Sequence, residues 1–221
     1  MKQYPSILGP SKAPLGSPCI AFYKYDGSNL RFEWTKKRSW FKFGTRHHLF
    51  DSSDPTFGLA ISLFSKTYAE PLEKLFVLDR KHFLRQPNDP VIVFCEFSGD
   101  KSQFGVHEPG NNDNKQLILF DVSLHKKGII PPKDFVSIFE PVIPIAKVIY
   151  EGNLNKEFIS AIKNGSYPSV KEGVVCKGIM KDGKLWMVKV KTNWWFEELK
   201  KKSLINKGLE SLLKEETANS L

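Results

Sequence analysis

The sequence predicts a mixed α+β fold, and three patterns support that class. Residues 29–35 alternate strictly between apolar and polar side chains, which is the period-2 signature of a half-buried β-strand. Residues 193–216 place leucines and a tryptophan so that they can pack while lysines stay in solvent, as in an amphipathic helix. Residues 181–184 hold an Asp-Gly pair between two apolar runs, which favours a type I′ hairpin turn.

The expected elements follow an irregular lead-in of 18 residues that holds four prolines. Strands are predicted at residues 19–23, 29–35, 40–43, 91–97, 117–122, 173–177 and 185–191. Helices are predicted at residues 57–69, where Asp54 and Pro55 offer an N-cap and a first-turn proline, and at 72–84, 155–163 and 193–216. We therefore expect a lead-in (1–18), one folded domain (19–192) and a C-terminal helical extension (193–221).

Length and charge narrow the class of protein. The 221 residues allow one large domain, and 41% hydrophobic residues are enough to bury a core. Lysine and arginine exceed aspartate and glutamate by 33 to 24, and the net charge of +9 predicts an attractive field for polyanions. Nucleic acid, nucleotide phosphates or an anionic membrane surface are the partners that this field favours.

Several classes of protein are disfavoured. The longest apolar runs fall far short of the ~20 residues that span a bilayer, and residues 1–10 do not resemble a signal peptide. The three cysteines include no CxxC pair, which favours a reducing, cytoplasmic compartment without disulfides. His47 and His48 would point in opposite directions on an extended chain, so a zinc site is not expected. No Rossmann, P-loop or nucleophile-elbow motif occurs.

Lys24 stands at the end of an apolar strand, with Asp26 and Gly27 directly after it. One interpretation is an ordinary surface turn with two solvated charges. The other is a nucleophilic lysine, which must lose its proton although its reference pKa is ~10.4. Burial or neighbouring cations would favour the neutral amine.

Lys189 and Lys191 share one face of their predicted strand, because residues two apart point the same way. They are either the solvated face of an edge strand or a pair of ammonium groups that neutralises a phosphate. In the second case they would also supply the cations that a nucleophilic lysine needs nearby.

Four further residues stand in settings that suggest a role. Glu96 and Glu172 lie in apolar strand surroundings, and such carboxylates are either exposed strand ends or groups that bind a ligand or metal. Phe120 ends an apolar strand, where a core phenylalanine is the ordinary explanation. Arg46 is either a surface arginine or a contact to phosphate or ribose. Around it, basic residues alternate with aromatic ones over residues 31–46, which suits a nucleic-acid strand, although some of these aromatics would be core.

The order of these motifs is more specific than any one of them. They are Lys24-x-Asp26-Gly27-x-Asn29, Gly44-Thr45-Arg46, Phe94-x-Glu96, Leu119-Phe120-Asp121, Glu172-Gly173-Val174-Val175 and Lys189-x-Lys191. The series resembles the motifs of the covalent nucleotidyltransferase superfamily, which contains ATP-dependent DNA ligases, RNA ligases and mRNA capping enzymes. Asparagine at position 29, in place of arginine, is more similar to the type-2 branch of the RNA ligases. The resemblance covers residues 20–192 and implies an ATP-grasp-like nucleotidyltransferase (adenylylation) domain with two antiparallel sheets and flanking helices.

The resemblance implies an ATP-dependent RNA ligase and gives each residue a role. Lys24 would attack the α-phosphate of ATP to form lysine–AMP, and the AMP would pass to a 5′-phosphate that a 3′-hydroxyl then joins. Lys189 and Lys191 would bind the α-phosphate, and Glu172 would bind Mg²⁺ or Mn²⁺ with support from Asn29. Glu96 would hold the ribose, Phe120 would stack on adenine, Arg46 would contact the nucleotide or the nick, and Tyr23 would join the nucleotide site.

Many members of the superfamily carry an OB-fold domain after the last lysine motif, whereas 30 residues follow Lys191 here. We therefore expect the basic surface, the C-terminal helix or a protein partner to replace it. RNA strand ends are the expected substrate, with DNA possible. A capping-type guanylyltransferase and a non-catalytic nucleic-acid-binding module are the alternatives.

Overall fold

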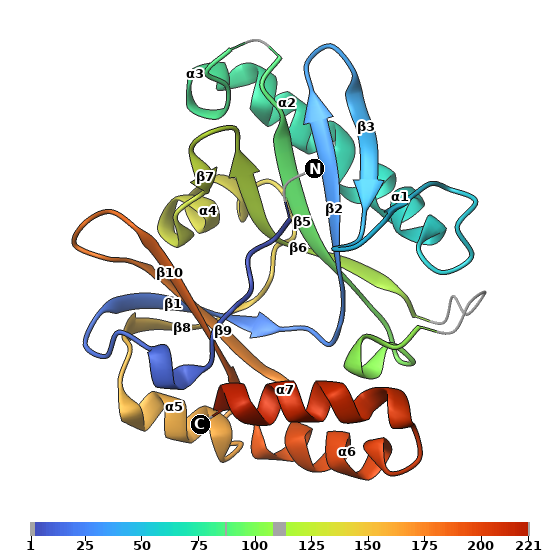
Figure 1. The fold of residues 1–221 in the computed structure, drawn as a ribbon. Helices are drawn as coiled ribbons and strands as arrows, with labels where there is room; N and C mark the ends of the chain where they lie inside the picture. The colour runs from blue at the N-terminus through green and yellow to red at the C-terminus, as the bar shows by residue number, and fades with distance from the viewer. Residues whose placement is uncertain (1–2, 87, 108–113, 221) are drawn as a thin grey trace. The chain divides into compact units, whose positions relative to one another are not determined.

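The computed structural model describes residues 3–86, 88–107 and 114–220 (Figure 1). Within these residues it contains two antiparallel sheets with flanking helices, which confirms the predicted α+β class. The chain divides into two compact units. The first unit comprises Met1–Tyr4 and Asp26–Ile145, and the second comprises Pro5–Tyr25 and Ala146–Leu221. Each unit is described by itself.

The first unit contains a sheet with the strand order β4-β3-β2-β5-β6-β7. Its strands are β2 (Gly27–Thr35), β3 (Ser39–Gly44), β4 (Leu49–Phe50), β5 (Val91–Ser98), β6 (Gln116–Leu124) and β7 (Gly128–Ile129). Its helices are α1 (Gly58–Phe64), a π-helical turn (Ser65–Ala69), α2 (Glu70–Leu78), α3 (Arg80–Phe83), the 3-10 helix η3 (Gln103–Gly105) and α4 (Pro132–Phe139). No helix was predicted at α4, which begins at two consecutive prolines, Pro131 and Pro132.

Strand β2 shows how sequence pattern becomes packing. Its apolar positions face the helices, where the ring of Phe32 stacks on Phe64 with centroids 4.0 Å apart. The polar positions from Arg31 to Thr35 are also buried, so the expectation of a half-buried strand is wrong. The reason is that β2 is a central strand of its sheet, and one of its buried charges has a partner: Oε2 of Glu33 lies 3.9 Å from Nζ of Lys42. Paired charges tolerate burial better than isolated ones.

The first long helical region starts later than expected. The carboxylate of Asp54 accepts hydrogen bonds from the backbone N–H groups of Thr56 and Phe57, both at 2.8 Å, and α1 begins at Gly58. Asp54 therefore caps the turn before the helix instead of serving as the N-cap.

The second unit contains a sheet with the strand order β10-β9-β1-β8. Its strands are β1 (Pro18–Lys24), β8 (Val148–Asn153), β9 (Gly173–Ile179) and β10 (Leu185–Lys191). Its helices are η1 (Pro10–Lys12), α5 (Lys156–Lys163), α6 (Asn193–Ser203), η4 (Lys207–Leu209) and α7 (Glu210–Ser220). One face of this sheet forms the hydrophobic core with α5, through residues that include Ala21, Val174, Val190 and Phe158. Because side chains alternate between faces, the neighbouring positions project from the other face.

Two local predictions for the second unit are wrong. In the hairpin between β9 and β10, Gly183 has φ +83° whereas Asp182 is not among the described residues with positive φ. A type I′ turn needs positive φ at both, and the observed loop is instead a longer one with glycine at the left-handed position. The predicted helix 193–216 is two helices, α6 and α7, side by side in Figure 1. The side chain of Asn206 accepts a hydrogen bond from the N–H of Gly208 and reverses the chain between them.

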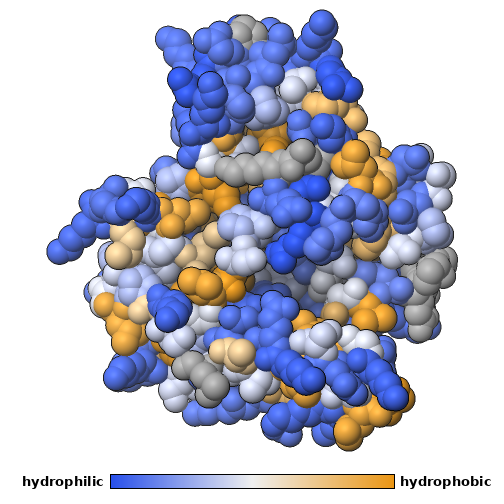
Figure 2. All heavy atoms as spheres, in the orientation of Figure 1, coloured by the Kyte–Doolittle hydropathy of each residue, from blue (hydrophilic) through white to orange (hydrophobic). Residues whose placement is uncertain are grey.

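The surface agrees with the composition. Figure 2 shows hydrophilic residues over much of the displayed face, with apolar residues between them. In the described ranges, no helix has both the length and the apolar composition needed to cross a membrane.

Replacing Phe32 by alanine should destabilise the protein by about 3 to 5 kcal/mol, because it removes a buried ring and leaves a cavity. Phe32 is fully buried in the first unit. Leu78→Ala, at a side chain that is 84% exposed, should change stability by less than about 0.5 kcal/mol. Urea unfolding followed by circular dichroism measures both, and similar losses for the two variants would contradict the packing described for β2.

Candidate active site

Lys24 and Lys191 lie on either side of Gly173 in the sheet of the second unit. Gly173 of β9 is paired in register with Lys24 of β1 and with Lys191 of β10. Paired residues project to the same face of a sheet, so both lysines lie on the face opposite the hydrophobic core. Lys189 precedes Lys191 by two residues and shares this face. The strands thus place all three predicted lysines on one surface.

A close approach of the strands explains why position 173 is glycine. A Cβ added to Gly173 would lie 2.1 Å from the carbonyl oxygen of Val190 and 2.8 Å from the Cα of Lys191. The obstructing atoms belong to the backbone and cannot rotate away. The N–H of Thr192 also donates to the carbonyl of Glu172 at 2.9 Å, which holds the end of β10 to the start of β9.

Glu172 connects two of the lysines. Its Oε1 lies 2.9 Å from Nζ of Lys24 and 2.9 Å from Nζ of Lys191, and the residue is buried. Its Oε2 is buried without a hydrogen-bond partner among the residues that the structure describes. An unsatisfied carboxylate oxygen in such a place is costly, and it is a ready position for a cation.

Lys191 is surrounded by both positive and negative charges. Burial lowers its pKa, and the nearby ammonium group of Lys24 lowers it further, while Glu172 and Glu216 oppose both effects. Its Nζ lies 3.2 Å from the ring centroid of Trp195, a cation–π contact. The backbone N–H of Trp195 donates a hydrogen bond to Oγ1 of Thr192, the N-cap of α6, and this contact fixes the start of the helix that carries the ring. Lys191 and Lys24 thus lie on either side of the same carboxylate oxygen of Glu172.

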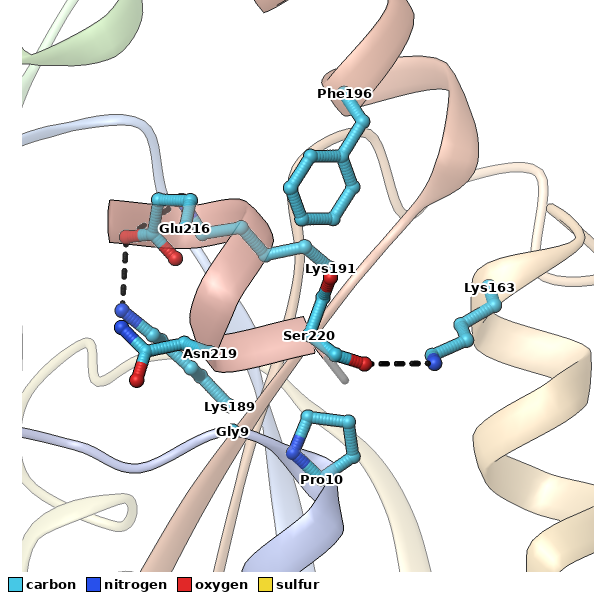
Figure 3. Close-up of a pocket in the computed structure, with 9 residues that line it drawn as sticks. All are labelled: Gly9, Pro10, Lys163, Lys189, Lys191, Phe196, Glu216, Asn219 and Ser220. Carbon is cyan, nitrogen blue, oxygen red and sulfur yellow. Dashed lines mark hydrogen bonds and ion pairs between the residues drawn. The ribbon is translucent and has the colours of Figure 1, made fainter. Parts of the chain in front are cut away.

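Glu216 of α7 also contacts these lysines, as Figure 3 shows. Its Oε1 lies 2.8 Å from Nζ of Lys189 and 3.4 Å from Nζ of Lys191. Burial raises the pKa of this carboxyl, but the lysines lower it more, and the net pKa is below its ordinary value. Sequence reasoning missed Glu216, because a glutamate in an amphipathic helix carries no signal that separates it from its solvated neighbours.

The first unit brings together other predicted residues. Asn29 of β2 is paired in register with Glu96 of β5, so the two side chains project to the same face. Phe120 is the extra residue of a β-bulge, since Phe94 is paired with Asp121 and the next residue of β5 is paired with Leu119. A bulge re-aims a side chain and is common beside functional sites. Periodicity in the sequence cannot encode this extra residue.

Tyr4 completes an aromatic cluster around Phe120. Their ring centroids lie 5.1 Å apart at 88°, and Tyr4 lies 5.0 Å from Phe94. The hydroxyl of Tyr4 donates to Asp121. Burial, and then the charge of Asp121, raise the pKa of Tyr4 well above its ordinary value. The sequence analysis assigned Tyr4 to an irregular lead-in and did not predict this contact.

Two other predicted residues have different surroundings. Arg46 is exposed in the turn after β3, and its carbonyl accepts a hydrogen bond from Gln3. His47 and His48 lie in the same turn, where their N–H groups donate to Oγ1 of Thr45. The ring of Tyr23 packs against the core of the second unit and lies 4.6 Å from that of Tyr25.

A second loop holds the residues that follow Lys24. Oδ1 of Asp26 accepts a hydrogen bond from the N–H of Phe104 at 2.7 Å, and its carbonyl accepts one from Ser98 at 2.7 Å. Nε2 of His107 lies 2.9 Å from Oγ of Ser28. Asp26, which the sequence placed in the lysine motif, therefore fixes the turn. The sequence did not indicate a role for His107, because its contact partner Ser28 lies 79 residues away along the chain.

The residues of the candidate site fit a divalent metal only in part. In the portion of the chain that the structure describes, no group of three or more His, Cys, Asp or Glu side chains could hold a metal ion. Oε2 of Glu172, buried without a hydrogen-bond partner among the described residues, nevertheless suits a hard cation such as Mg²⁺, which is often bound by one carboxylate together with substrate phosphates and water.

Comparison with known proteins gives one family and a set of related folds. A family model described as RNA ligase matches residues 17–191. A comparison with curated proteins finds no match.

Among solved structures, a Naegleria gruberi RNA ligase with pyrophosphate is similar with a TM-score of 0.63 and 15% identity, over 91% of this chain and 58% of that chain. A putative ATP-dependent DNA ligase from Aquifex aeolicus has a TM-score of 0.58 and 18% identity, over 96% and 59%. An archaeal ATP-dependent RNA ligase has a TM-score of 0.62 and 16% identity, over 90% and 51%. This chain thus spans somewhat more than half the length of these proteins, and at these identities the likeness establishes the fold.

Replacing Gly173 by alanine should destabilise the protein by about 3 kcal/mol, since the strands must separate and the buried ion pairs of Glu172 are disturbed. Gly183→Ala is the matched control at the other end of the same hairpin, where a Cβ would meet nothing within 4 Å. That variant should lose only about 1 kcal/mol, from its left-handed conformation. Urea unfolding measures both. Equal losses of stability in the two variants would show that the close approach of the strands at Gly173 does not contribute to stability.

His107 should make stability depend on pH. Burial, and then the charge of Lys115, lower its pKa from 6.5 to about 4. The unfolded chain therefore binds a proton more readily between those values, so this contribution to stability falls as the pH falls from 6.5 to about 4. When the pH is lowered from 7 to 5, the unfolding free energy of His107→Gln should therefore fall by about 1 kcal/mol less than that of the wild type. Urea titrations at both pH values test this, and parallel profiles would contradict it.

Proposed function

Because the chain belongs to the RNA ligase family, whose model matches residues 17–191, we propose that it is an ATP-dependent RNA ligase acting through a lysine–AMP intermediate. The observation that carries the proposal is the arrangement around Gly173, where Lys24 and Lys191 flank one strand and share the buried carboxylate of Glu172. The arrangement offers a nucleophile and a set of cations on one face of a sheet. Phosphoryl and nucleotidyl transfer need chiefly such positioning and charge neutralisation.

In the first step, the neutral amine of Lys24 attacks the α-phosphorus of ATP. A P–N bond forms, the bond between the α-phosphorus and the bridging oxygen breaks, and pyrophosphate leaves. The ammonium of Lys24 must first lose its proton and its contact with Glu172, because a protonated amine has no lone pair. Lys189 and Lys191 bind the α-phosphate oxygens and stabilise the charge that grows on them.

The AMP then passes from Lys24 to the 5′-phosphate of an RNA strand. A phosphoanhydride forms and the P–N bond breaks. The 3′-hydroxyl of a second strand attacks the 5′-phosphate, and AMP leaves as the phosphodiester forms. One set of lysines can serve all three steps, since each is a displacement at a phosphorus that carries negative charge.

The remaining residues of the proposal bind the nucleotide and the strand. Glu96 holds the ribose, Phe120 stacks on adenine, and Asn29 supports the phosphate network. Support comes from the register pairing of Asn29 with Glu96 and from the bulge at Phe120. Arg46, exposed after β3, contacts the nucleotide or the nick, and Tyr23 belongs to the nucleotide site through its place beside Lys24.

A divalent metal, Mg²⁺ or Mn²⁺, belongs to the same proposal, with Glu172 as its carboxylate ligand and Asn29 in support. Bound there, it would neutralise phosphate charge. The buried Oε2 of Glu172, which has no hydrogen-bond partner among the described residues, supports this assignment. Structures of Naegleria gruberi RNA ligase variants hold ATP and Mn, or AMP and Mn.

We assign the strand ends of RNA as substrate and a reducing, cytoplasmic compartment as the site of action. The RNA ligase family supports the substrate, and three buried cysteines that are all free support the compartment. A DNA substrate is the alternative that the Aquifex aeolicus neighbour favours. A protein partner that supplements the strand-binding surface stays a prediction. The division into residues 1–18, 19–192 and 193–221 stays a proposal about the chain's functional parts.

The proposal predicts that the protein labels itself. Incubation with α-labelled ATP and Mg²⁺ or Mn²⁺ should attach AMP to Lys24, and Lys24→Ala should give no label. Lys189→Ala and Lys191→Ala should each slow labelling by about 100-fold, as expected when a group that stabilises transition-state charge is removed. Lys184→Ala is the matched control, because Lys184 is exposed on the same hairpin. Its rate should equal that of the wild type.

Other outcomes separate the alternatives. Labelling by GTP in preference to ATP would indicate a capping-type guanylyltransferase. Sealing of nicks with DNA but not RNA on the 3′-hydroxyl side would indicate a DNA ligase. Salt-sensitive strand binding without any covalent label would indicate a non-catalytic module and would end the proposal.

A further inference from the structure

Helix α7 rests on the two lysines to which the proposed function assigns the α-phosphate (Figure 3). The contact is made by Glu216, which is only 6% exposed. Lys189 at 2.8 Å and Lys191 at 3.4 Å both approach the same carboxylate oxygen. Residues 189 and 216 come from different elements and are brought together by the return of the chain after α6.

A carboxylate in this position presents to the lysines what a phosphate oxygen would present. It is an anionic oxygen within ion-pair distance of two ammonium groups. Lys24, Lys189 and Lys191 supply three positive charges, and Glu172 and Glu216 supply two negative ones. A phosphate added to the same lysines would meet the charge of Glu216 at close range, and like charges in a buried site repel strongly.

The way α7 is attached makes it easy to release. Of the α7 residues that the structure describes, Glu216 is the one whose side chain is buried. Near its end, the carbonyl of Ser220 accepts a hydrogen bond from Nζ of Lys163 at 3.4 Å. Leu212 and Leu213 are only half-buried. A helix with so little fully buried apolar surface opens at low free energy, and an anion that competes for the lysines would favour the open state.

We propose that α7 is an autoinhibitory element, and that Glu216 occupies Lys189 and Lys191 until the α-phosphate of ATP displaces it. The inference rests on the proposed function, since it takes these two lysines as the α-phosphate site. Glu216 is thus a competitor of the nucleotide. The alternative, that Glu216 positions the lysines for catalysis, makes the opposite prediction for its removal.

The first experiment compares Glu216→Gln with the wild type in the labelling assay across ATP concentrations. Loss of the competing charge should lower the apparent KM for ATP by about tenfold, which corresponds to ~1.4 kcal/mol. Glu215→Gln is the matched control, because it removes the same charge from the neighbouring exposed residue of α7. It should leave the apparent KM unchanged. An unchanged or higher KM in a folded Glu216→Gln variant would overturn the inference.

The second experiment uses the wild-type chain and keeps the test valid if Glu216→Gln fails to fold. Hydrogen exchange over residues 210–220 is measured with and without an ATP analogue whose α and β phosphates are joined by methylene, which cannot donate AMP. Faster exchange in α7 with the analogue supports release of the helix. Unchanged or slower exchange, in a protein that labels itself with ATP, would overturn the inference alone. A wild type that neither labels itself nor binds the analogue would overturn the proposed function, and this inference with it.

Discussion

A buried carboxylate shared by two ammonium groups is the interaction on which the second unit depends. Glu172 contacts Lys24 from one strand and Lys191 from another, and it can do so because Gly173 lets the backbones approach closely. Burying the charges of Glu172 and Lys191 is unfavourable unless they are paired, so the strand register, the glycine and the cap at Thr192 must agree. Because Lys24 contacts Glu172, our proposal requires Lys24 to leave this contact before its nitrogen can attack.

The first unit brings together a second set of the proposed site residues on a regular sheet. Asn29 and Glu96 achieve this by direct register pairing, whereas Phe120 depends on a bulge. The turn that begins at Asp26 is held by hydrogen bonds from Phe104 and Ser98, so the residues after Lys24 are fixed by segments distant in the sequence. Rigid support of this kind is what precise positioning requires.

Helix α7 gives the lysine face a further property. Its buried carboxylate forms ion pairs with Lys189 and Lys191 and offsets part of their positive charge. Burying a lysine costs less free energy when a carboxylate is paired with it than when it has no partner. The helix therefore contributes both to stability and, by our proposal, to control of nucleotide binding.

The sequence by itself determined the α+β class, most strands, and the residues whose position follows from local pattern. Lys189 and Lys191 share a face because strands have a period of two, and Gly173 follows Glu172 in a motif that can be read directly. Only the tertiary structure placed Glu216 on those lysines and Tyr4 on Asp121, 117 residues away. It also decided the bulge at Phe120. The physical reason is that local periodicity encodes which face a residue takes, while long-range contacts and inserted residues depend on how whole elements pack.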